Sequence, residues 1–294
     1  MKNKIKILLI LLIILSGIDI YLKFNTKEKY YVDSDNIIHH ENRPKIEFTR
    51  QLVEDRENYT KEKIIFNSKE TKIYGYLFLP KLKGKVPGVI FLPAAQATKE
   101  GAATESKIFL KNGFAVLTID QRGIGETDGY VPGIEQDYNN FINNRETTQS
   151  LMVYDALRLF DIFNSIENID KNKIVISGES MGGRTAIIAG GIEKKIKGVL
   201  IISSSGYESP KKNNETANNF LDSINPNNYI YRISPRKLIM IHSENDTVIP
   251  IKDAEYTFSL AKEPKEFIKI KNCNHGYCDE MNSTINESLN NLII

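Results

Sequence analysis

The stretch ISGESMGGRTA, residues 176–186, decides the fold. Its pentapeptide GESMG (178–182) is a G-x-S-x-G pattern between an apolar run and an alanine- and isoleucine-rich segment. A strand before this pattern and a helix after it would place Ser180 on a sharp, strained turn. The glycines two residues to either side leave room for that turn, where a Cβ would clash. The stretch therefore predicts a nucleophilic serine at a strand-to-helix turn.

Strand and helix patterns alternate on both sides of this turn. An antiparallel hairpin is predicted at 61–68 and 71–80, and apolar runs typical of buried strands occur at 86–93, 114–120, 173–178, 197–203, 237–242 and 265–270. Helical spacing is found at 99–112, 145–164, 181–191, 252–262 and 279–291. An α/β fold follows, with a mostly parallel sheet, an antiparallel N-terminal hairpin and helices on both faces.

Three other segments have weaker patterns. Residues 25–60 are predicted to form a polar stalk with a short helix near 48–58, and His39 and His40 within it are expected to be solvated. Residues 130–144 are expected to be a polar loop, and 207–230 a small cap insertion with one helical turn. The globular domain is therefore expected to span 61–294.

The composition limits the class of protein. With 294 residues, of which 41% are hydrophobic and 26% charged, the chain is long enough for one large domain with a sizeable core. Its 39 basic and 37 acidic residues nearly cancel, and no basic cluster follows the first residues. A nucleic-acid partner is therefore not expected. No feature of the sequence predicts the oligomeric state.

The first 24 residues are expected to lie outside the fold. Three lysines in 2–6 precede the unbroken apolar run 7–15, as in a secretory signal. No A-x-A cleavage site follows, and the apolar stretch of about 18 residues at 5–22 is near the lower limit for a membrane span. An uncleaved anchor or a weakly cleaved signal is predicted, with the catalytic domain outside the cytoplasm and the membrane contacted only through this segment. A buried N-terminal helix of a cytosolic protein is the alternative.

From Lys61 to the C terminus the chain resembles an α/β-hydrolase, and within that superfamily a single-domain serine esterase or serine-peptidase-like hydrolase. The resemblance rests on four motifs: GESMGG (178–183), DQRGIGETDG (120–129), HSENDTVIP (242–250) and NHG (274–276). In this family the segment at 120–129 is mainly structural. The resemblance therefore implies no catalytic role for Asp120 or Arg122.

A serine nucleophile needs a base that takes its proton and a carboxylate that orients this base. In the α/β-hydrolase family they occur along the chain in the order serine, acid, histidine. Only His242 and His275 follow Ser180. Because His242 precedes any candidate acid, it is expected to be structural, and His275 is the predicted base. The resemblance implies Asp246 as the acid, with Glu244 in the same loop as the alternative.

An oxyanion hole needs two N–H donors, one of them from the residue after the nucleophile, here Met181. The second is expected from the loop after the strand at 86–93, with Ala95 as first choice and Ala94 as second. Relatives commonly carry His-Gly in this loop, whereas this chain has Pro93-Ala94-Ala95, and proline cannot donate.

Side chains around the site have less certain roles. Glu179 and Arg184 flank the serine and are expected to lie on the helix surface or in an intramolecular ion pair rather than to contact substrate. Four aromatic loop residues are candidate pocket walls, although such residues are more often simply packed: Tyr130, Tyr138, Phe141 and Tyr207. The substrate-binding residues are not predicted.

The stretch CNHGYC, 273–278, places both cysteines of the chain around His275. Two cysteines are too few for a zinc site, and no second C-x-x-C or H-x-x-x-H accompanies them, so no metal is expected. A redox pair would normally be C-x-x-C. A disulfide between Cys273 and Cys278 suits an exported domain and would stiffen the loop. Free thiols are the alternative in a reducing compartment.

Together these features predict a serine hydrolase that cleaves a small-molecule carboxylic ester through an acyl-enzyme intermediate, without a cofactor. A peptidase of the prolyl-oligopeptidase or aminopeptidase type, acting on short peptides, and a thioesterase use the same three residues and are alternatives. A non-catalytic hydrolase-fold binding protein is a further alternative, since the fold alone does not determine function.

Overall fold

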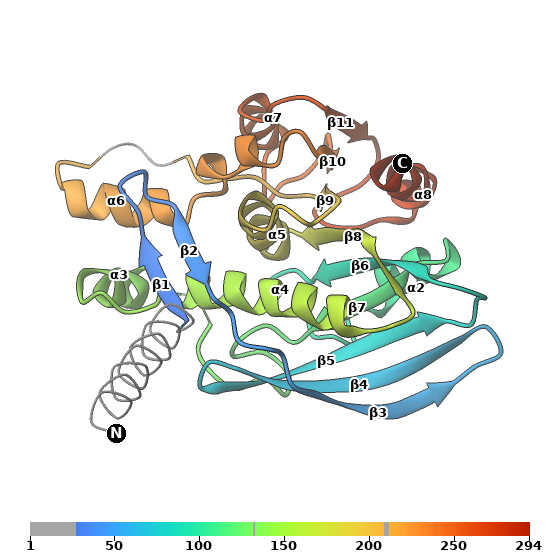
Figure 1. Ribbon diagram of the computed structural model, residues 1–294. Helices are drawn as coiled ribbons and strands as arrows, with labels where there is room; N and C mark the ends of the chain where they lie inside the picture. Colours follow the sequence, from blue (N-terminus) through green and yellow to red (C-terminus); the bar gives the residue numbers. More distant parts are fainter. Residues whose placement is uncertain (1–27, 132, 209–211) are drawn as a thin grey trace, which may run out of the picture.

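A nine-stranded sheet forms the centre of the computed structural model, which describes residues 28–131, 133–208 and 212–294 (Figure 1). Its strand order is β11-β10-β9-β8-β6-β7-β5-β4-β3. The strands are β3 (Phe48–Asp55), β4 (Tyr59–Ser68), β5 (Thr71–Pro80), β6 (Val86–Leu92), β7 (Ala115–Ile119), β8 (Ile169–Glu179), β9 (Gly198–Ile202), β10 (Lys237–Ser243) and β11 (Lys265–Ile270). Strands β6 to β11 are parallel to one another, whereas β3, β4 and β5 join the sheet as antiparallel strands.

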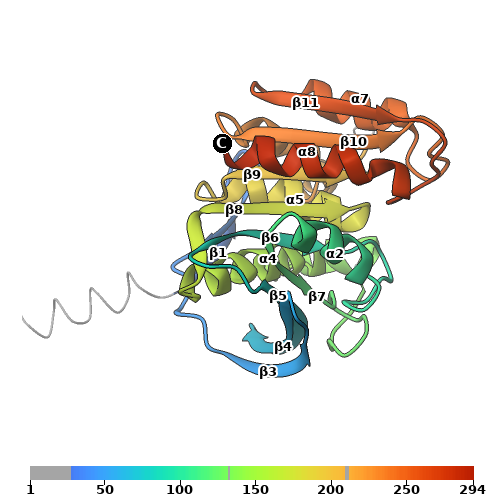
Figure 2. The ribbon, with the colours of Figure 1, turned by 90° about the vertical axis from the view of Figure 1, so that its right-hand side faces the viewer.

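Helices cover both faces of the sheet (Figures 1 and 2). One face carries α4 (Thr148–Ser165), α5 (Met181–Ile192) and α7 (Ile251–Ser259), and the other carries α2 (Ala103–Lys111) and α8 (Asn282–Ile293). Successive strand residues point to opposite faces, so Ile174 and Ile176 pack beneath α4 and α5 while Val175 belongs to the core on the side of α2 and α8. The expected α/β-hydrolase fold, including the antiparallel hairpin β4–β5, is confirmed.

A small cap gathers at one end of the molecule (Figure 1). It consists of the hairpin β1 (Lys29–Val32) and β2 (Ile38–Glu41), helices α3 (Ile134–Ile142) and α6 (Glu215–Ser223), and the 3-10 turns η1 (Pro226–Asn228) and η2 (Ile230–Arg232). The ring of Phe220 in α6 lies 5.7 Å from that of Tyr138 and 5.6 Å from that of Phe141, both in α3. The loop expected at 130–144 and the single turn expected in 207–230 are thus wrong, because each segment forms a helix that packs against the other.

The short helix expected near 48–58 is also wrong, because these residues form β3 at the edge of the sheet. Leu52 and Val53 are both exposed, at 59% and 46%, and the pairing with β4 is irregular between Leu52 and Glu54. An edge strand with such an irregularity has no alternating burial, so its pattern does not distinguish it from a polar helix.

The stalk expected over 25–60 is wrong for its middle part, which packs on the domain. Ile37, Ile38 and Ile46 are buried, and so is His40, whose ring lies 5.0 Å from that of Tyr154 in α4. The expectation that His40 is solvated is therefore wrong, and burial lowers its pKa to about 3, so the ring is neutral. His39 is half-buried, and its Nε2 lies 2.7 Å from Asp33.

The predicted signal or anchor, residues 1–24, lies outside the described residues. In the described part of the chain, no helix has the length and apolar character needed to cross a membrane.

Candidate active site

Ser180 lies between β8 and α5 in a strained backbone conformation. Its φ of 51° and ψ of −114° are rarely adopted by a residue with a side chain, and its N–H donates to the Ile202 carbonyl at 3.0 Å. A Cβ on Gly178 would collide with the carbonyl of Gly182, and a Cβ on Gly182 would collide with the backbone of Leu92 and of the proline after it. The two glycines therefore let α5 begin directly against the end of β6.

His275 joins the other two predicted residues by hydrogen bonds. Its Nε2 lies 2.9 Å from Ser180 Oγ, and its Nδ1 lies 2.8 Å from Asp246 Oδ2. The serine follows β8, the aspartate follows β10 and the histidine follows β11, so the ends of three parallel strands bring the groups together. This arrangement fits a ring with its proton on Nδ1, whose Nε2 accepts from the serine hydroxyl.

Asp246 is buried and held in place by the backbone of its own loop. Its Oδ1 accepts from the N–H groups of Val248 at 2.9 Å and Ile249 at 2.8 Å, while Oδ2 is the oxygen nearer to His275 and also lies 3.4 Å from His242 Nε2. His242, in β10, is fully buried, and its Nε2 lies 2.8 Å from the Ile249 carbonyl. Burial lowers the pKa of this histidine. That position agrees with the structural role expected for His242. Glu244, the alternative acid, is exposed.

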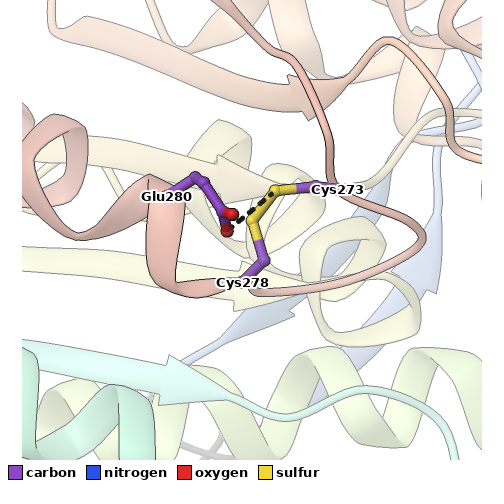
Figure 3. A group of neighbouring side chains, drawn as sticks. All are labelled: Cys273, Cys278 and Glu280. Atoms are coloured by element: carbon purple, nitrogen blue, oxygen red, sulfur yellow. Dashed lines mark hydrogen bonds between the residues drawn. A yellow bond between two sulfur atoms is a disulfide. The ribbon is translucent and has the colours of Figure 1, made fainter.

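The loop that carries His275 is anchored at several points. Ser243 Oγ donates to the Cys273 carbonyl at 2.5 Å, and Ser203 Oγ donates to the Gly276 carbonyl at 3.2 Å. Cys273 and Cys278 form a disulfide across the loop (Figure 3). The sequence offered no indication that the two serines hold this loop.

Glu280, in the turn η3 (Asp279–Met281), points toward the disulfide in Figure 3. Its carboxylate and the two sulfurs lie within 4.8 Å of one another, which is close enough for a metal site. A sulfur in a disulfide is not a thiolate, however, and metal binding by cysteine needs the thiolate. The chemistry of this group therefore does not suit a metal ion.

The two predicted oxyanion donors are Met181, which directly follows Ser180, and Ala95, in the loop after β6. Met181 is the first residue of α5, where a helix leaves backbone N–H groups without intrahelical acceptors. Ala95 is exposed in a tight turn in which the Ala97 N–H donates to the Ala94 carbonyl at 3.2 Å. Gln121, which the sequence did not single out, donates its side-chain N–H to the Pro93 carbonyl and so holds the start of this loop. The oxyanion role of Met181 and Ala95 stays a prediction.

Asp120 and Arg122 take part in buried ion pairs rather than lying at the site. Asp120 Oδ2 accepts from Lys99 Nζ at 2.6 Å, and Arg122 Nε donates to Asp155 Oδ2 at 2.8 Å. All four side chains are almost fully buried. They connect β7 and the segment after it to α4 and to the loop before α2, which is a structural role.

The ion pair considered for Glu179 and Arg184 is wrong, since among the described residues neither side chain is in one. Arg184 Nε donates to the Ser205 carbonyl at 3.1 Å, and its guanidinium lies 4.4 Å from the centre of the Tyr207 ring. Glu179 instead faces Glu105 of α2. No sequence pattern indicated this pairing of two carboxyl groups.

The four candidate pocket walls are dispersed. Tyr138 and Phe141 lie in the cap, and Tyr207 lies beside Arg184. Tyr130 is 69% exposed.

Comparison with known families places this site in context. A family model described as acetyl xylan esterase (AXE1) matches residues 37–204, more than half of the chain. The matched segment includes Ser180 and ends before Asp246 and His275. It begins within the segment that was expected to be a stalk.

Two curated relatives share moderate sequence identity. The uncharacterized protein YfhR of Escherichia coli O157:H7 is 28% identical over 166 residues, which cover 54% of this chain and 58% of the relative. Acetyl esterase Axe7A of Xylanibacter ruminicola is 26% identical over 244 residues, which cover 72% of this chain and 54% of the relative. The chain thus spans about half the length of the curated relatives it matches.

Solved structures resemble nearly the whole described fold. Acetyl xylan esterase 1 from Thermoanaerobacterium sp. has a TM-score of 0.72 at 17% identity, covering 86% of this chain and 89% of that one. An acetyl xylan esterase from Paenibacillus sp. R4 has a TM-score of 0.71 at 19% identity, covering 85% and 89%. At this level of identity, the likeness shows the shared α/β-hydrolase fold.

Proposed function

The chain belongs to the acetyl xylan esterase family, and from this membership we propose that it is a serine carboxylesterase acting on a small-molecule ester. The observation that supports the proposal best is the pair of hydrogen bonds from His275, 2.8 Å to Asp246 and 2.9 Å to Ser180. Because the named relatives include acetyl esterases, an acetyl ester is the first substrate to test.

The proposed reaction has two halves. Ser180 Oγ attacks the ester carbonyl while His275 Nε2 takes its proton, and the resulting imidazolium then protonates the leaving alcohol. A water molecule, deprotonated by His275, next attacks the acyl-enzyme, and the imidazolium returns this proton to Ser180 Oγ as the bond to the acyl group breaks and the carboxylic acid leaves. Asp246 keeps the Nδ1 proton in place and stabilises the imidazolium. The mechanism requires no cofactor.

The negative charge on the carbonyl oxygen is proposed to be bound by the N–H groups of Met181 and Ala95. A backbone donor is independent of side-chain identity, so the alanine can replace the His-Gly of relatives. Gly182 lets the helix that begins at Met181 approach the loop after β6, which contains Ala95, and this supports the pairing of the two donors.

The test uses the purified full-length chain and its Ser180→Ala variant with p-nitrophenyl esters from acetyl to dodecanoyl, aminoacyl and prolyl anilides, and acetyl thioesters. Ester turnover that is fastest with acetyl and absent in S180A is the expected result. Faster anilide or thioester cleavage would instead favour the peptidase or thioesterase. If no substrate is turned over and a fluorophosphonate does not label Ser180, the binding-protein alternative replaces the esterase.

We propose further that the catalytic domain works outside the cytoplasm. The disulfide at Cys273 and Cys278 supports this, because such bonds persist in oxidising compartments. Fractionation of cells expressing the full-length chain tests the proposal, and recovery of the activity in the cytoplasmic fraction with free thiols would refute it.

A further inference from the structure

Two glutamate side chains, Glu179 and Glu105, lie against each other next to the turn that carries Ser180. Glu179 is the residue before Ser180, and Glu105 lies in the first turn of α2, 74 positions earlier in the chain. Glu105 is buried and Glu179 is half-buried, and a hydrogen bond joins their carboxyl groups. Two carboxylates cannot form such a bond, because neither carries a donor.

The structure also indicates which carboxyl carries the proton. Burial, followed by the charge of Glu105 and the hydrogen bond to it, raises the pKa of Glu179 to about 7, so that Glu179 is the donor. Burial also raises the pKa of Glu105, whose hydrogen bond with Glu179 acts in the opposite direction, as expected for the acceptor. Glu105 Oε2 is buried and has no N–H or hydroxyl donor among the described residues, so a carboxyl proton is the donor that this site lacks.

Glu179 also contacts the loop that carries His275. A Cβ on Gly276 would collide with Glu179 Oε1, so the carboxyl packs against the backbone of the residue after His275. The Tyr277 N–H also donates to the same carboxyl, and this hydrogen bond affects the pKa of Glu179 less than Glu105 does. Gly276 has a φ of 88°, which glycine adopts without strain. The carboxyl pair therefore lies between α2, the turn at Ser180 (the nucleophile turn) and the loop 271–278 that carries His275 (the histidine loop).

Glu179 faces three titratable residues, and a fourth contacts one of these three. Glu105 approaches from α2, and His275 and Tyr277 approach from the histidine loop. Asp279 of η3 accepts from the Tyr277 hydroxyl at 3.0 Å. Of these, His275 and the backbone N–H of Tyr277 favour the ionised form of Glu179, and the effect of His275 is the smallest among the causes of the shift.

We propose that protonated Glu179, hydrogen-bonded to Glu105, is a positioning residue that holds the His275 loop against the nucleophile turn. The inference rests on the proposed function, since it concerns the loop of the proposed base. Ionisation of Glu179 places two negative charges side by side in a buried site. Their repulsion separates α2 from the nucleophile turn and shifts the loop, and esterase activity then falls on the alkaline side.

Glutamine at position 179 is the decisive substitution, because its amide mimics the protonated carboxyl at every pH. Glu179→Gln, Glu179→Ala and the matched surface control Glu255→Gln are compared with the wild type from pH 5.5 to 9.5. The measurements are kcat/KM for p-nitrophenyl acetate and the rate at which a fluorophosphonate labels Ser180. Circular dichroism monitors folding at each pH.

The expected result is an alkaline decline in the wild type and in E255Q that is absent in E179Q. E179Q should keep its activity at pH 6.5 within about threefold, whereas E179A should lose about 10- to 100-fold, as expected when a catalytic group is misplaced by about 1 Å. If E179A does not fold, the pH profile of E179Q still decides.

Two results would overturn the inference. A wild type without an alkaline decline, or an E179Q variant that declines as the wild type does, would show that the carboxyl pair does not position the loop, while labelling of Ser180 would leave the esterase proposal intact. A wild type that is neither active nor labelled at any pH would overturn the proposed function and this inference together.

Discussion

Replacing Cys273 and Cys278 by serine separates the stability of the histidine loop from its catalytic geometry. The disulfide closes a short ring with a sequence separation of 5. The chain-entropy relation gives about 2 kcal/mol for a ring of about six residues, mainly by restricting the unfolded chain. For a domain of this size, a loss of about 2 kcal/mol lowers Tm by about 4–8 °C.

The same loop keeps three hydrogen bonds when the disulfide is removed. They join Ser243 to the backbone of residue 273, Ser203 to Gly276, and His275 to Asp246. Each hydrogen bond stabilises the folded loop by about 1 kcal/mol net, so the three together contribute more than the roughly 2 kcal/mol lost with the disulfide. The loop should therefore stay ordered, so that Tm falls while kcat for an acetyl ester changes less than about threefold, a loss of under 1 kcal/mol of transition-state stabilisation.

The assay combines thermal unfolding with steady-state kinetics for the wild type, the wild type with a reductant, and the double serine variant. The reduced wild type should match the variant, and the reductant should have no effect on the variant. An unchanged Tm with a loss of kcat above about 30-fold would refute the reasoning, because about 2 kcal/mol would then have come from the geometry of the folded loop.

Four further outcomes are expected. Asp246→Asn should lower kcat by about 10⁴-fold, because an amide supports the wrong imidazole tautomer, as ester kinetics would show. Arg122→Met should destabilise the fold by about 3–5 kcal/mol in urea unfolding, because it leaves the buried Asp155 carboxylate unpaired. Gly182→Ala should reduce both stability and kcat, because its Cβ meets backbone oxygens at the end of β6, and urea unfolding and kinetics would measure the two losses. The pKa of Glu179 is raised from 4.5 in the fold, so its contribution to stability is present below pH 4.5 and is lost as the pH rises through about 7; urea unfolding across this range should show a decline that E179Q lacks.

The central part of the fold could be predicted because most residues of its strands are surrounded by apolar side chains, whichever face of the sheet they point to. The strands from β6 to β10 lie in the middle of the sheet and are covered on both faces, so their sequences are short apolar runs. The turn at Ser180 was equally evident, because its glycines are required by close backbone contacts. The positions of Asp246 and His275 follow from strand order in the fold, whereas their catalytic role stays a prediction.

The periphery could not be predicted, because its structure depends on contacts between distant segments. Strand β3 is defined by its pairing with β4 and not by its own pattern. Helices α3 and α6 depend on each other through the rings of Tyr138 and Phe220. The Glu105–Glu179 pair joins α2 to the nucleophile turn, and nothing in either local sequence indicates it.

The histidine loop needs several separate contacts to hold it in place because it follows β11, a strand at the edge of the sheet. This strand is at the edge of the sheet and pairs only with β10, so the loop after it is supported from one side. His275 must nevertheless keep hydrogen bonds to two partners that follow other strands. The additional support comes from Ser203 after β9, Ser243 at the end of β10, Glu179 at the end of β8 and the disulfide. Since each acts on a different point of the loop, loss of one should displace the histidine only in part, and loss of two should reduce activity by more than the product of the single effects.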